Sequence, residues 1–136
     1  MRLFEHEGKA LFKKAGLRVP SGKLVESADD CAALDDGVWP KMVKAQTLKG
    51  GRGKAGAIVK AASVKELRAA VKSLVGHSVN GEEVASVLVE ERLSIEREYY
   101  LSITYKNDLP AIIFSRRGGI DVEELSSKKP AEVVLE

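Results

Sequence analysis

The sequence has few of the residues that most often build metal and redox centres. Among its 136 residues are one cysteine, Cys31, and two histidines, His6 and His77. A single cysteine forms no disulfide within the chain and no thiolate-rich metal centre. Two isolated histidines are too few for a histidine-based zinc site. We therefore expect neither a thiolate-rich nor a histidine-based metal site in this chain.

Aromatic residues and long apolar runs are also scarce. Aromatic residues make up 5% of the chain, which argues against a stacking platform for single-stranded nucleic acid. The apolar run at residues 111–114 is far too short to cross a membrane, and residues 1–9 carry charges where a signal peptide is apolar. The sequence therefore predicts a cytoplasmic protein, or a mitochondrial matrix protein in a eukaryote, with no nucleic-acid or membrane partner.

Charge of one sign is not in excess either. There are 22 Lys and Arg residues against 20 Asp and Glu residues, a formal net charge of +2. This near-balance excludes a polybasic arm or an acidic tail as the organising feature. With 44% hydrophobic and 31% charged residues, the composition is typical of a globular domain.

The sequence does contain an alternation of helical and strand-like segments, which predicts an α/β (α+β) fold class. Expected helices span residues 4–15, 27–37 and 63–76, and expected strands span residues 22–25, 40–46, 57–61, 85–91, 98–105 and 111–115. We expect a polar loop at 78–83 and one helical turn at 122–125. Residues 133–135 resemble the start of an unpaired strand, so we expect the chain to be part of a longer polypeptide.

Four of the 12 glycines lie in one stretch, residues 49–56. Residues 51–56 have the spacing G-x-G-x-x-G, but a strand-like segment follows where a dinucleotide-binding loop needs a helix. Lys54 precedes Ala55 rather than Ser or Thr, which excludes a mononucleotide P-loop. A strand, glycine loop and strand remain, and such a hairpin can lay its backbone N–H groups over phosphate oxygens. The basic residues here are Lys44, Lys49, Arg52 and Lys54.

Three other interpretations of this stretch stay open. One is a mobile surface loop with solvated charges. A second is non-specific contact with nucleic acid, which the small net charge disfavours. A third is a kinase-like lobe in which Lys60 on the following strand binds phosphate, although the H-R-D and D-F-G motifs are missing.

A second group of candidate residues follows the expected strand at 85–91. An apolar strand that ends in a carboxylate, here Glu90, suits an adenine pocket, because apolar side chains cover the base. A carboxylate eight positions later, Glu98, can accept hydrogen bonds from the two ribose hydroxyls. The alternative is that both carboxylates are solvated charges at a strand rim.

Together these segments resemble the N-terminal part of the ATP-grasp acyl-CoA ligases that form a nucleoside diphosphate, in particular the β chains of succinyl-CoA synthetases. The segments that carry the resemblance are Ala10-Leu-Phe12 with Gly16-Leu17, Val43-Lys-Ala-Gln46 with Gly50-Gly-Arg-Gly-Lys-Ala-Gly56, Leu88-Val-Glu90 with Glu98-Tyr-Tyr-Leu101, and Gly118-Gly-Ile-Asp-Val-Glu-Glu124. The resemblance implies the N-terminal region of an ATP-grasp fold, with a glycine-rich β-hairpin loop and without the second half of that fold.

The resemblance also assigns the phosphate-binding residues. Lys44 falls on the phosphate-contacting lysine of the family, and Gly51, Arg52 and Gly53 fall on the loop that closes over the phosphates. Neither histidine falls on a functional position, and no catalytic residue is expected in this fragment. The nucleotide is expected to be ATP or GTP.

The base and ribose contacts are assigned in the same way. Glu90 falls on the hinge that meets adenine, and Leu93 falls on a second hinge position that acts through its backbone. Glu98 falls on the glutamate that binds the ribose. The expected lobes comprise residues 1–20 with 103–136 and residues 21–102, and the second half of the grasp and the CoA-ligase domain are absent from this chain.

By resemblance, the whole enzyme belongs to the tricarboxylic acid cycle and couples cleavage of the nucleotide to acyl-CoA formation. The phosphate passes through a phosphohistidine on a partner α subunit, which also binds most of the CoA. The Mg²⁺ ligands of the family lie beyond Glu136, so the resemblance implies no metal ligand among the residues of this chain. A carboxylic acid is the remaining substrate.

One departure from the family pattern affects the choice of acid. Residues 115–119 read Ser-Arg-Arg-Gly-Gly, with Arg117 where many members carry an acidic residue before the paired glycines. This charge reversal keeps open a citryl-CoA or malyl-CoA synthetase homologue, or a nucleotide-binding module without catalysis. A structural subunit that binds no nucleotide is a further alternative.

Overall fold

The computed structural model describes residues 2–106, 109–116, 118 and 133–135. The chain divides into two compact units, Met1–Leu93 and Ser94–Glu136. These bounds differ from those of the expected lobes, residues 1–20 with 103–136 and residues 21–102, and that lobe division stays a prediction.

The first unit is built on one antiparallel sheet with the strand order β1-β6-β2-β3. Its strands are β1 (Gly22–Val25), β2 (Lys41–Ala45), β3 (Ile58–Ala61) and β6 (Val87–Glu91). The glycine loop connects β2 to β3, which pair as a hairpin, so the predicted glycine-rich β-hairpin is confirmed. Strand β6 lies in the interior of the sheet, between β1 and β2.

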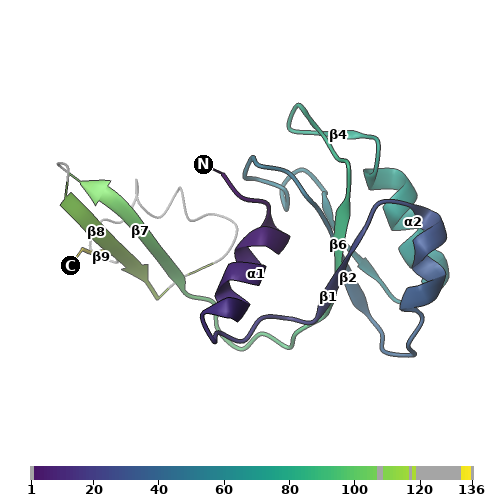
Figure 1. Ribbon diagram of the computed structural model, residues 1–136, viewed down its shortest axis with the longest axis horizontal. Coiled ribbons are helices and arrows are strands. Elements are labelled where there is room, and N and C mark those ends of the chain that lie inside the picture. The colour runs from purple at the N-terminus through teal and green to yellow at the C-terminus, as the bar shows by residue number, and fades with distance from the viewer. Residues whose placement is uncertain (1, 107–108, 117, 119–132, 136) are drawn as a thin grey trace. The chain divides into compact units, whose positions relative to one another are not determined.

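Helices lie on both faces of this sheet (Figure 1). On one face are the α-helix α2 (Val64–Leu74) and the short 3₁₀ helix η1 (Ala28–Leu34), and on the other face is α1 (Glu5–Lys14). The Ser63 hydroxyl caps α2 by accepting a hydrogen bond from the Glu66 N–H. Helix α1 ends before Gly16, whose φ of +80° suits glycine at this position.

The hydrophobic core lies between the sheet and α2. Side chains alternate along each strand, so Val43 and Ala45 are fully buried while Met42 and Lys44 face the α1 side. Helix α2 contributes the apolar stripe that its spacing predicts, including Leu67 and Val71. The core residues are Val25, Cys31, Val43, Ala45, Ala57, Ala61, Leu67, Ala70, Val71, Leu74, Val79, Val84, Val87 and Val89.

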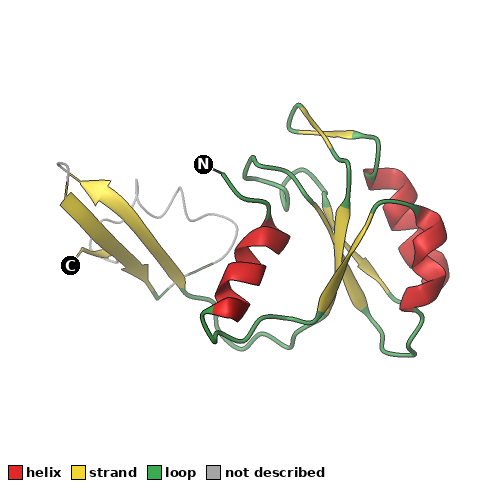
Figure 2. Cartoon of the chain, in the orientation of Figure 1, coloured by secondary structure: helices red, strands yellow, loops and turns green. Residues whose placement is uncertain are grey.

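Two segments differ from the sequence-based expectations (Figure 2), and a third cannot be compared. The segment expected as a helix over 27–37 forms 3₁₀ structure at Ala28–Leu34, and the Ser27 hydroxyl caps its start by accepting a hydrogen bond from the Asp29 N–H. The expected polar loop at 78–83 is a hairpin of β4 (Ser78–Val79) and β5 (Glu82–Glu83). The expected helical turn at 122–125 lies outside the described residues.

The second unit is a three-stranded antiparallel sheet with the order β7-β8-β9. Its strands are β7 (Tyr100–Lys106), β8 (Leu109–Ser115) and β9 (Val133–Leu135). The prediction of an unpaired strand at 133–135 is wrong, because β9 pairs with β8 along its whole length.

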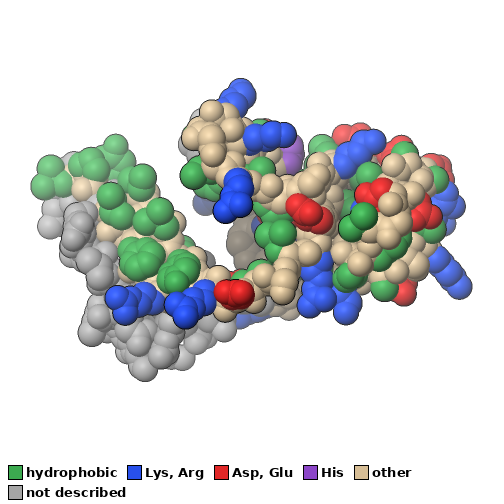
Figure 3. All heavy atoms as spheres, turned by 90° about the horizontal axis from the view of Figure 1, so that it is seen from below, with side chains coloured by type: hydrophobic (Ala, Val, Ile, Leu, Met, Phe, Trp, Pro, Cys, Tyr) green, Lys and Arg blue, Asp and Glu red, His purple; other side chains and the backbone are tan. Residues whose placement is uncertain are grey.

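One face of the β7–β8 hairpin is apolar. Its cross-strand pairs are Leu101 with Phe114, Ile103 with Ile112, and Tyr105 with Pro110. Large side chains on this face are exposed, Ile103 to 75% and Tyr105 to 76%. Hydrophobic side chains gather over this hairpin in Figure 3. We call these six residues the apolar face of β7–β8.

Candidate nucleotide site

The sheet face opposite the core carries charged side chains in the middle of the fold. Lys44 on β2 is paired with Leu88 on β6, and Met42 is paired with Glu90. Lys44 and Glu90 are therefore diagonal neighbours on the same face, within reach of each other. The Lys44 Nζ atom lies 2.8 Å from Glu90 Oε2. Glu90 is only 2% exposed.

Helix α1 adds two charged residues to this pair. Glu5 and Lys9 are one turn apart, with Lys9 Nζ 2.6 Å from Glu5 Oε1, and Lys9 also forms an ion pair with Glu90. Glu5 Oε1 accepts a hydrogen bond from Lys44 Nζ at 3.1 Å. Helix α1 is thus tied to the sheet by charged groups, and all ten of its residues keep some exposure.

Arg52 of the glycine loop completes the arrangement. Its Nη2 atom lies 2.7 Å from Glu5 Oε2, and its Nη1 atom donates a hydrogen bond to the Ala45 carbonyl at 2.8 Å. We call Glu5, Lys9, Lys44, Arg52 and Glu90 the ion-pair cluster. It holds three cations and two carboxylates, a formal surplus of one positive charge, so it suits an additional anion.

The contacts within the cluster shift the pKa values of Glu5 and Lys44 in opposite directions. Burial raises the pKa of Glu5, but the hydrogen bond from Lys9 and the charges of Lys44 and Arg52 outweigh it and lower the pKa to about 2. For Lys44, burial lowers the pKa, but the hydrogen bond to Glu90 and the charge of Glu5 outweigh it, and the pKa is raised. Both groups therefore stay charged at neutral pH.

A glycine on the neighbouring strand makes room for Glu90. Gly22 on β1 is paired with Glu90, and a Cβ atom at Gly22 would lie 2.7 Å from Glu90 Cγ. Such a separation is too short for two carbon atoms, so a larger residue at position 22 would displace the carboxylate. Gly22 was not among the predicted site residues.

The glycine loop folds into a compact turn. Ala55 N–H donates to the Gly51 carbonyl at 3.0 Å and Ala57 N–H donates to the Arg52 carbonyl at 2.9 Å. Gly51 and Gly56 have φ values of +78° and +68°, a region that favours glycine. The turn sets the Arg52 guanidinium against the end of β2.

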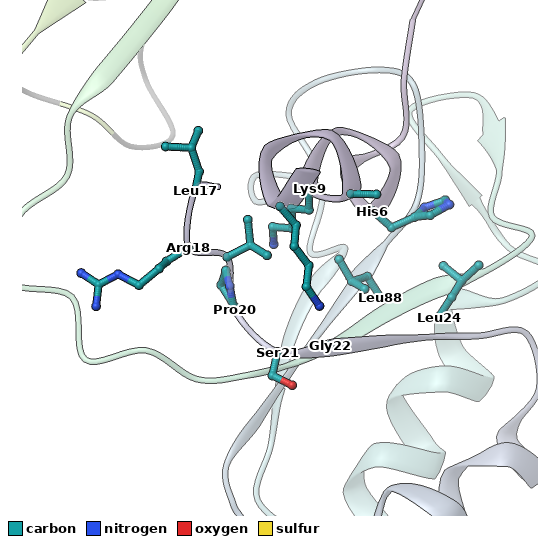
Figure 4. A pocket seen from close by; sticks show the side chains of 12 residues that line it. His6, Lys9, Leu17, Arg18, Pro20, Ser21, Gly22, Leu24 and Leu88 are labelled. Carbon is teal, nitrogen blue, oxygen red and sulfur yellow. The ribbon is translucent and has the colours of Figure 1, made fainter. Parts of the chain in front are cut away.

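A cavity of about 630 Å³ lies between α1 and the edge of the sheet (Figure 4). Its wall is apolar at Leu24 and Leu88, and Lys9 reaches into it from α1. The lining residues are His6, Lys9, Ala10, Lys13, Leu17, Arg18, Val19, Pro20, Ser21, Gly22, Leu24 and Leu88. Because Lys9 also binds Glu90, the cavity adjoins the ion-pair cluster.

The structure brings three of the predicted side chains together, Lys44, Arg52 and Glu90, through shared contacts with Glu5 and Lys9. The predicted glycines Gly51 and Gly53 flank Arg52 within the same turn.

The other two predicted residues lie outside this cluster. Leu93 is 49% exposed beyond the end of β6. Glu98 is exposed in the second unit, where its carbonyl accepts a hydrogen bond from the Gly118 N–H at 3.0 Å. Their roles stay predictions.

Sequence reasoning missed Glu5 and Lys9. Their spacing of four residues on a helix was visible as a possible salt bridge. Nothing in the sequence indicated that α1 lies on the sheet above Lys44, because that contact joins residues about 40 positions apart.

The described residues give no sign of a metal centre or a membrane span. Among residues 2–106, 109–116, 118 and 133–135, no three His, Cys, Asp or Glu side chains are grouped to hold a metal ion. No helix within these ranges has the length and apolar character needed to cross a bilayer.

Comparison with known protein sequences places these features in a family. Residues 2–135 match the ATP-grasp domain family. The β subunit of ADP-forming succinate–CoA ligase from Methanocaldococcus jannaschii is 44% identical over 98% of this chain and 37% of its own length. A β subunit of the same ligase from Archaeoglobus fulgidus is 43% identical over 96% of this chain and 35% of its own. The chain thus spans about a third of these relatives.

Solved structures show the same fold. A dinucleotide-forming acetyl-coenzyme A synthetase from Candidatus Korarchaeum cryptofilum, in complex with coenzyme A and Ca-AMPCP, matches with a TM-score of 0.75 and 20% identity over 98% of this chain and 59% of its own. ATP citrate lyase from Methanothrix soehngenii, in complex with citrate and coenzyme A, matches with a TM-score of 0.70 and 19% identity over 99% of this chain and 34% of its own. The chain is therefore a member of the ATP-grasp family, homologous to succinate–CoA ligase β subunits, and has the mixed α/β fold of the N-terminal ATP-grasp region.

Proposed function

We propose that this chain is the nucleotide-binding part of an acid–CoA ligase β subunit. The observation that carries the proposal is the ion-pair cluster, in which Lys44 of β2 and Arg52 of the glycine loop share one carboxylate, Glu5. Two cations from a strand and a glycine loop form a binding site for polyphosphate. The 44% identity to a succinate–CoA ligase β subunit supports the same proposal.

In this proposal Lys44, Arg52 and the N–H groups of Gly51 and Gly53 bind the phosphates. Phosphoryl transfer depends on cations and dipoles aimed at the phosphate oxygens, and these groups supply both. Nucleotide binding requires Lys44 and Arg52 to exchange carboxylate contacts for phosphate contacts. Glu5 and Glu90 hold the two cations in place before that exchange, which limits the entropy lost on binding.

The base would lie in the cavity between α1 and the edge of the sheet. Its apolar wall, which includes Leu24 and Leu88, is suited to a base, and it adjoins Glu90 at the end of β6. The backbone at Glu90 and Leu93 would contact the base, and Glu98 would bind the ribose hydroxyls. ATP and GTP are both candidates.

The rest of the reaction would use parts outside these 136 residues. Mg²⁺, held by residues of the remaining polypeptide, would neutralise phosphate charge. A partner α subunit would carry the phosphohistidine and bind CoA, and the reaction would yield an acyl-CoA in the tricarboxylic acid cycle, in the cytoplasm or mitochondrial matrix. The fragment alone is expected to be inactive.

Succinate is the first acid to test, because both named relatives are succinate–CoA ligases. The citrate and malate alternatives rest on Arg117, which lies outside the described residues. Both acids therefore belong in the same assay. ADP release by the assembled ligase with each acid in turn would identify the substrate. A chain that binds nucleotide but supports turnover with no acid would instead be a non-catalytic nucleotide-binding module.

Nucleotide binding itself is tested by NMR on the ¹⁵N-labelled chain, with ATP and AMP added to millimolar concentration. We expect ATP to shift the amide signals of Gly51, Arg52 and Gly53, and AMP, which has one phosphate, to shift them much less. Lys44→Met should weaken ATP binding about tenfold or more, because a hydrogen bond to a charged group is lost.

Lys72→Met is the matched control, since Lys72 is exposed on α2, on the opposite face of the sheet. It should leave ATP binding unchanged. Equal effects of the two lysine variants would contradict the assignment of Lys44. ATP-induced shifts confined to the α2 side, or the absence of any shift, would contradict the proposed function of this chain.

A further inference from the structure

The short β4–β5 hairpin contacts the glycine loop although the two are about 30 residues apart in sequence. Its turn is Asn80-Gly81, with φ values of +53° and +79°, as a two-residue type I′ turn requires. The base of the hairpin is fixed in the core by Val79 and Val84, which are 7% and 0% exposed. The hairpin is therefore anchored independently of the loop.

Four hydrogen bonds join the hairpin to the residues that lead into the loop. The Glu82 carboxylate accepts from Leu48 N–H at 2.7 Å and from Lys49 N–H at 3.3 Å. Lys49 Nζ donates to the Asn80 carbonyl at 3.0 Å, and Asn80 Nδ2 donates to the Gly50 carbonyl at 2.9 Å. We call these four bonds the loop–hairpin contacts.

These contacts replace the apolar packing that the glycine loop lacks. Leu48 is 39% exposed, and the residues that follow it are small or charged. A segment of this composition has little to fix its position except hydrogen bonds. The contacts hold three consecutive residues, 48–50, directly before Gly51. The path of the backbone into the Gly51–Gly53 segment is thus set by the hairpin.

The side chains involved are not required by the hairpin itself. Asp-Gly forms a type I′ turn as well as Asn-Gly does, so the amide group of Asn80 is free for the loop. Glu82 precedes Glu83 on the same strand, and its carboxylate turns to the loop while Glu83 is exposed. The turn chemistry alone does not account for either contact.

We propose that Asn80 and Glu82 are positioning residues for the phosphate-binding loop. They act through Leu48, Lys49 and Gly50 and make no contact with the nucleotide. This inference rests on the proposed function for its consequence, phosphate binding, but its structural part can be measured without nucleotide. The hairpin would hold the loop N–H groups in place before the polyphosphate arrives, which reduces the ordering cost of binding.

The structural part is tested on the ¹⁵N-labelled chain by heteronuclear NOE and amide hydrogen exchange. Glu82→Ala should lower the NOE over residues 48–53 and speed exchange of the Leu48 and Lys49 amides. Asn80→Asp keeps the turn but removes the donor to Gly50, so it should lower the NOE as well. Glu83→Ala, the matched control on the same strand, should leave both measurements unchanged. Equal behaviour of Glu82→Ala and Glu83→Ala would overturn the inference.

The functional part compares ATP and AMP binding in the same variants. Glu82→Ala should weaken ATP binding about tenfold through the added cost of ordering the loop, while AMP binding should change little. Equal losses of ATP affinity and AMP affinity would indicate general damage to the fold and overturn the positioning role. A lowered NOE with unchanged ATP affinity would overturn it too. Failure of wild-type chain to bind ATP would contradict the proposed function, and the NOE comparison would still decide whether the hairpin orders the loop.

Discussion

Glu5 joins three cations, of which Lys9 and Lys44 also contact Glu90 while Arg52 reaches the cluster through Glu5. Its two oxygens contact Lys9, Lys44 and Arg52, from a helix, a strand and a loop. Removing one partner of a buried charge pair costs far more than removing both, because the other charge stays buried and uncompensated. At the scale of single residues, Glu5 therefore links the docking of α1 to the charge state of the proposed phosphate site.

The low pKa of Glu5 predicts a defined acid sensitivity. The pKa is about 2 in the folded chain against an ordinary value of 4.5, so the carboxylate stabilises the fold above pH 4.5. This contribution, about 1–3 kcal/mol after allowance for solvent screening, is lost as the pH falls from 4.5 toward 2. Urea unfolding of wild type and of Glu5→Gln, measured above and below this pH window, tests this prediction. The free energies of unfolding of the two proteins should become equal in acid. A constant difference across the window would contradict this role.

Glu98 offers a test of the proposed ribose contact. Ribose is distant from the reacting phosphate, so its contacts contribute equally to the ground state and the transition state. In the assembled ligase, Glu98→Gln should raise the nucleotide KM several-fold with little change in kcat. Glu96→Gln, at an exposed position two residues earlier, is the control. A loss confined to kcat would rule out the ribose role.

At the scale of elements, α2 holds the sheet that carries the site. Leu67 is fully buried between α2 and the strands, and truncation there leaves a cavity. We expect Leu67→Ala to lower the free energy of unfolding by about 2–5 kcal/mol. Trp39 packs against the same core, so its fluorescence reports the transition in urea.

The control for this prediction lies on the same helix. Lys72→Ala replaces an exposed residue and should change the stability by less than about 0.5 kcal/mol. A similarly small effect of Leu67→Ala would show that α2 contributes little to the stability of the first unit.

Local patterns predicted most elements, because each has its own signal. The alternation of Met42, Val43 and Lys44 gave the two faces of β2, and Ser63 gave the start of α2. One error arose where the outcome depends on a distant partner, because residues 133–135 pair with β8. The other overlooked a local signal, because Asn80-Gly81 in the expected polar loop closes a two-residue hairpin.

The residues of the candidate site also divide into those that the sequence predicted and those that it did not. Spacing and resemblance indicated Lys44, Arg52 and Glu90, and the structure connects all three within one cluster. Glu5 was not predicted, since its role depends on where α1 lies against the sheet. The space that Gly22 leaves for Glu90 was also missed, because it is a property of two paired strands.

At the scale of the whole molecule, the apolar face of β7–β8 is a group of neighbouring exposed hydrophobic side chains, a feature typical of interaction sites and of aggregation-prone surfaces. We expect it to bind the dye ANS and to promote self-association of the chain. Ile103→Thr keeps β propensity while removing apolar area, so it should lower ANS fluorescence. The unfolding midpoint reported by Trp39, in the first unit, should not change.

Ser102→Thr is the control for this prediction, because Ser102 belongs to the opposite face of β7. It should leave ANS fluorescence at the wild-type level. If Ile103→Thr binds ANS as strongly as wild type does, the dye site lies elsewhere on the molecule.

The interior position of β6 has a consequence for how this chain tolerates mutation. Val87 and Val89 face the core, while Leu88 and Glu90 face the proposed ligand, so odd and even positions of one five-residue strand carry separate tasks. Libraries at Leu88 can redirect base preference while the core valines stay in place, whereas substitutions at Glu90 also remove the carboxylate that compensates Lys9 and Lys44 and should lower the melting temperature. An insertion or deletion of one residue in β6 would exchange the two sets and abolish folding and binding together.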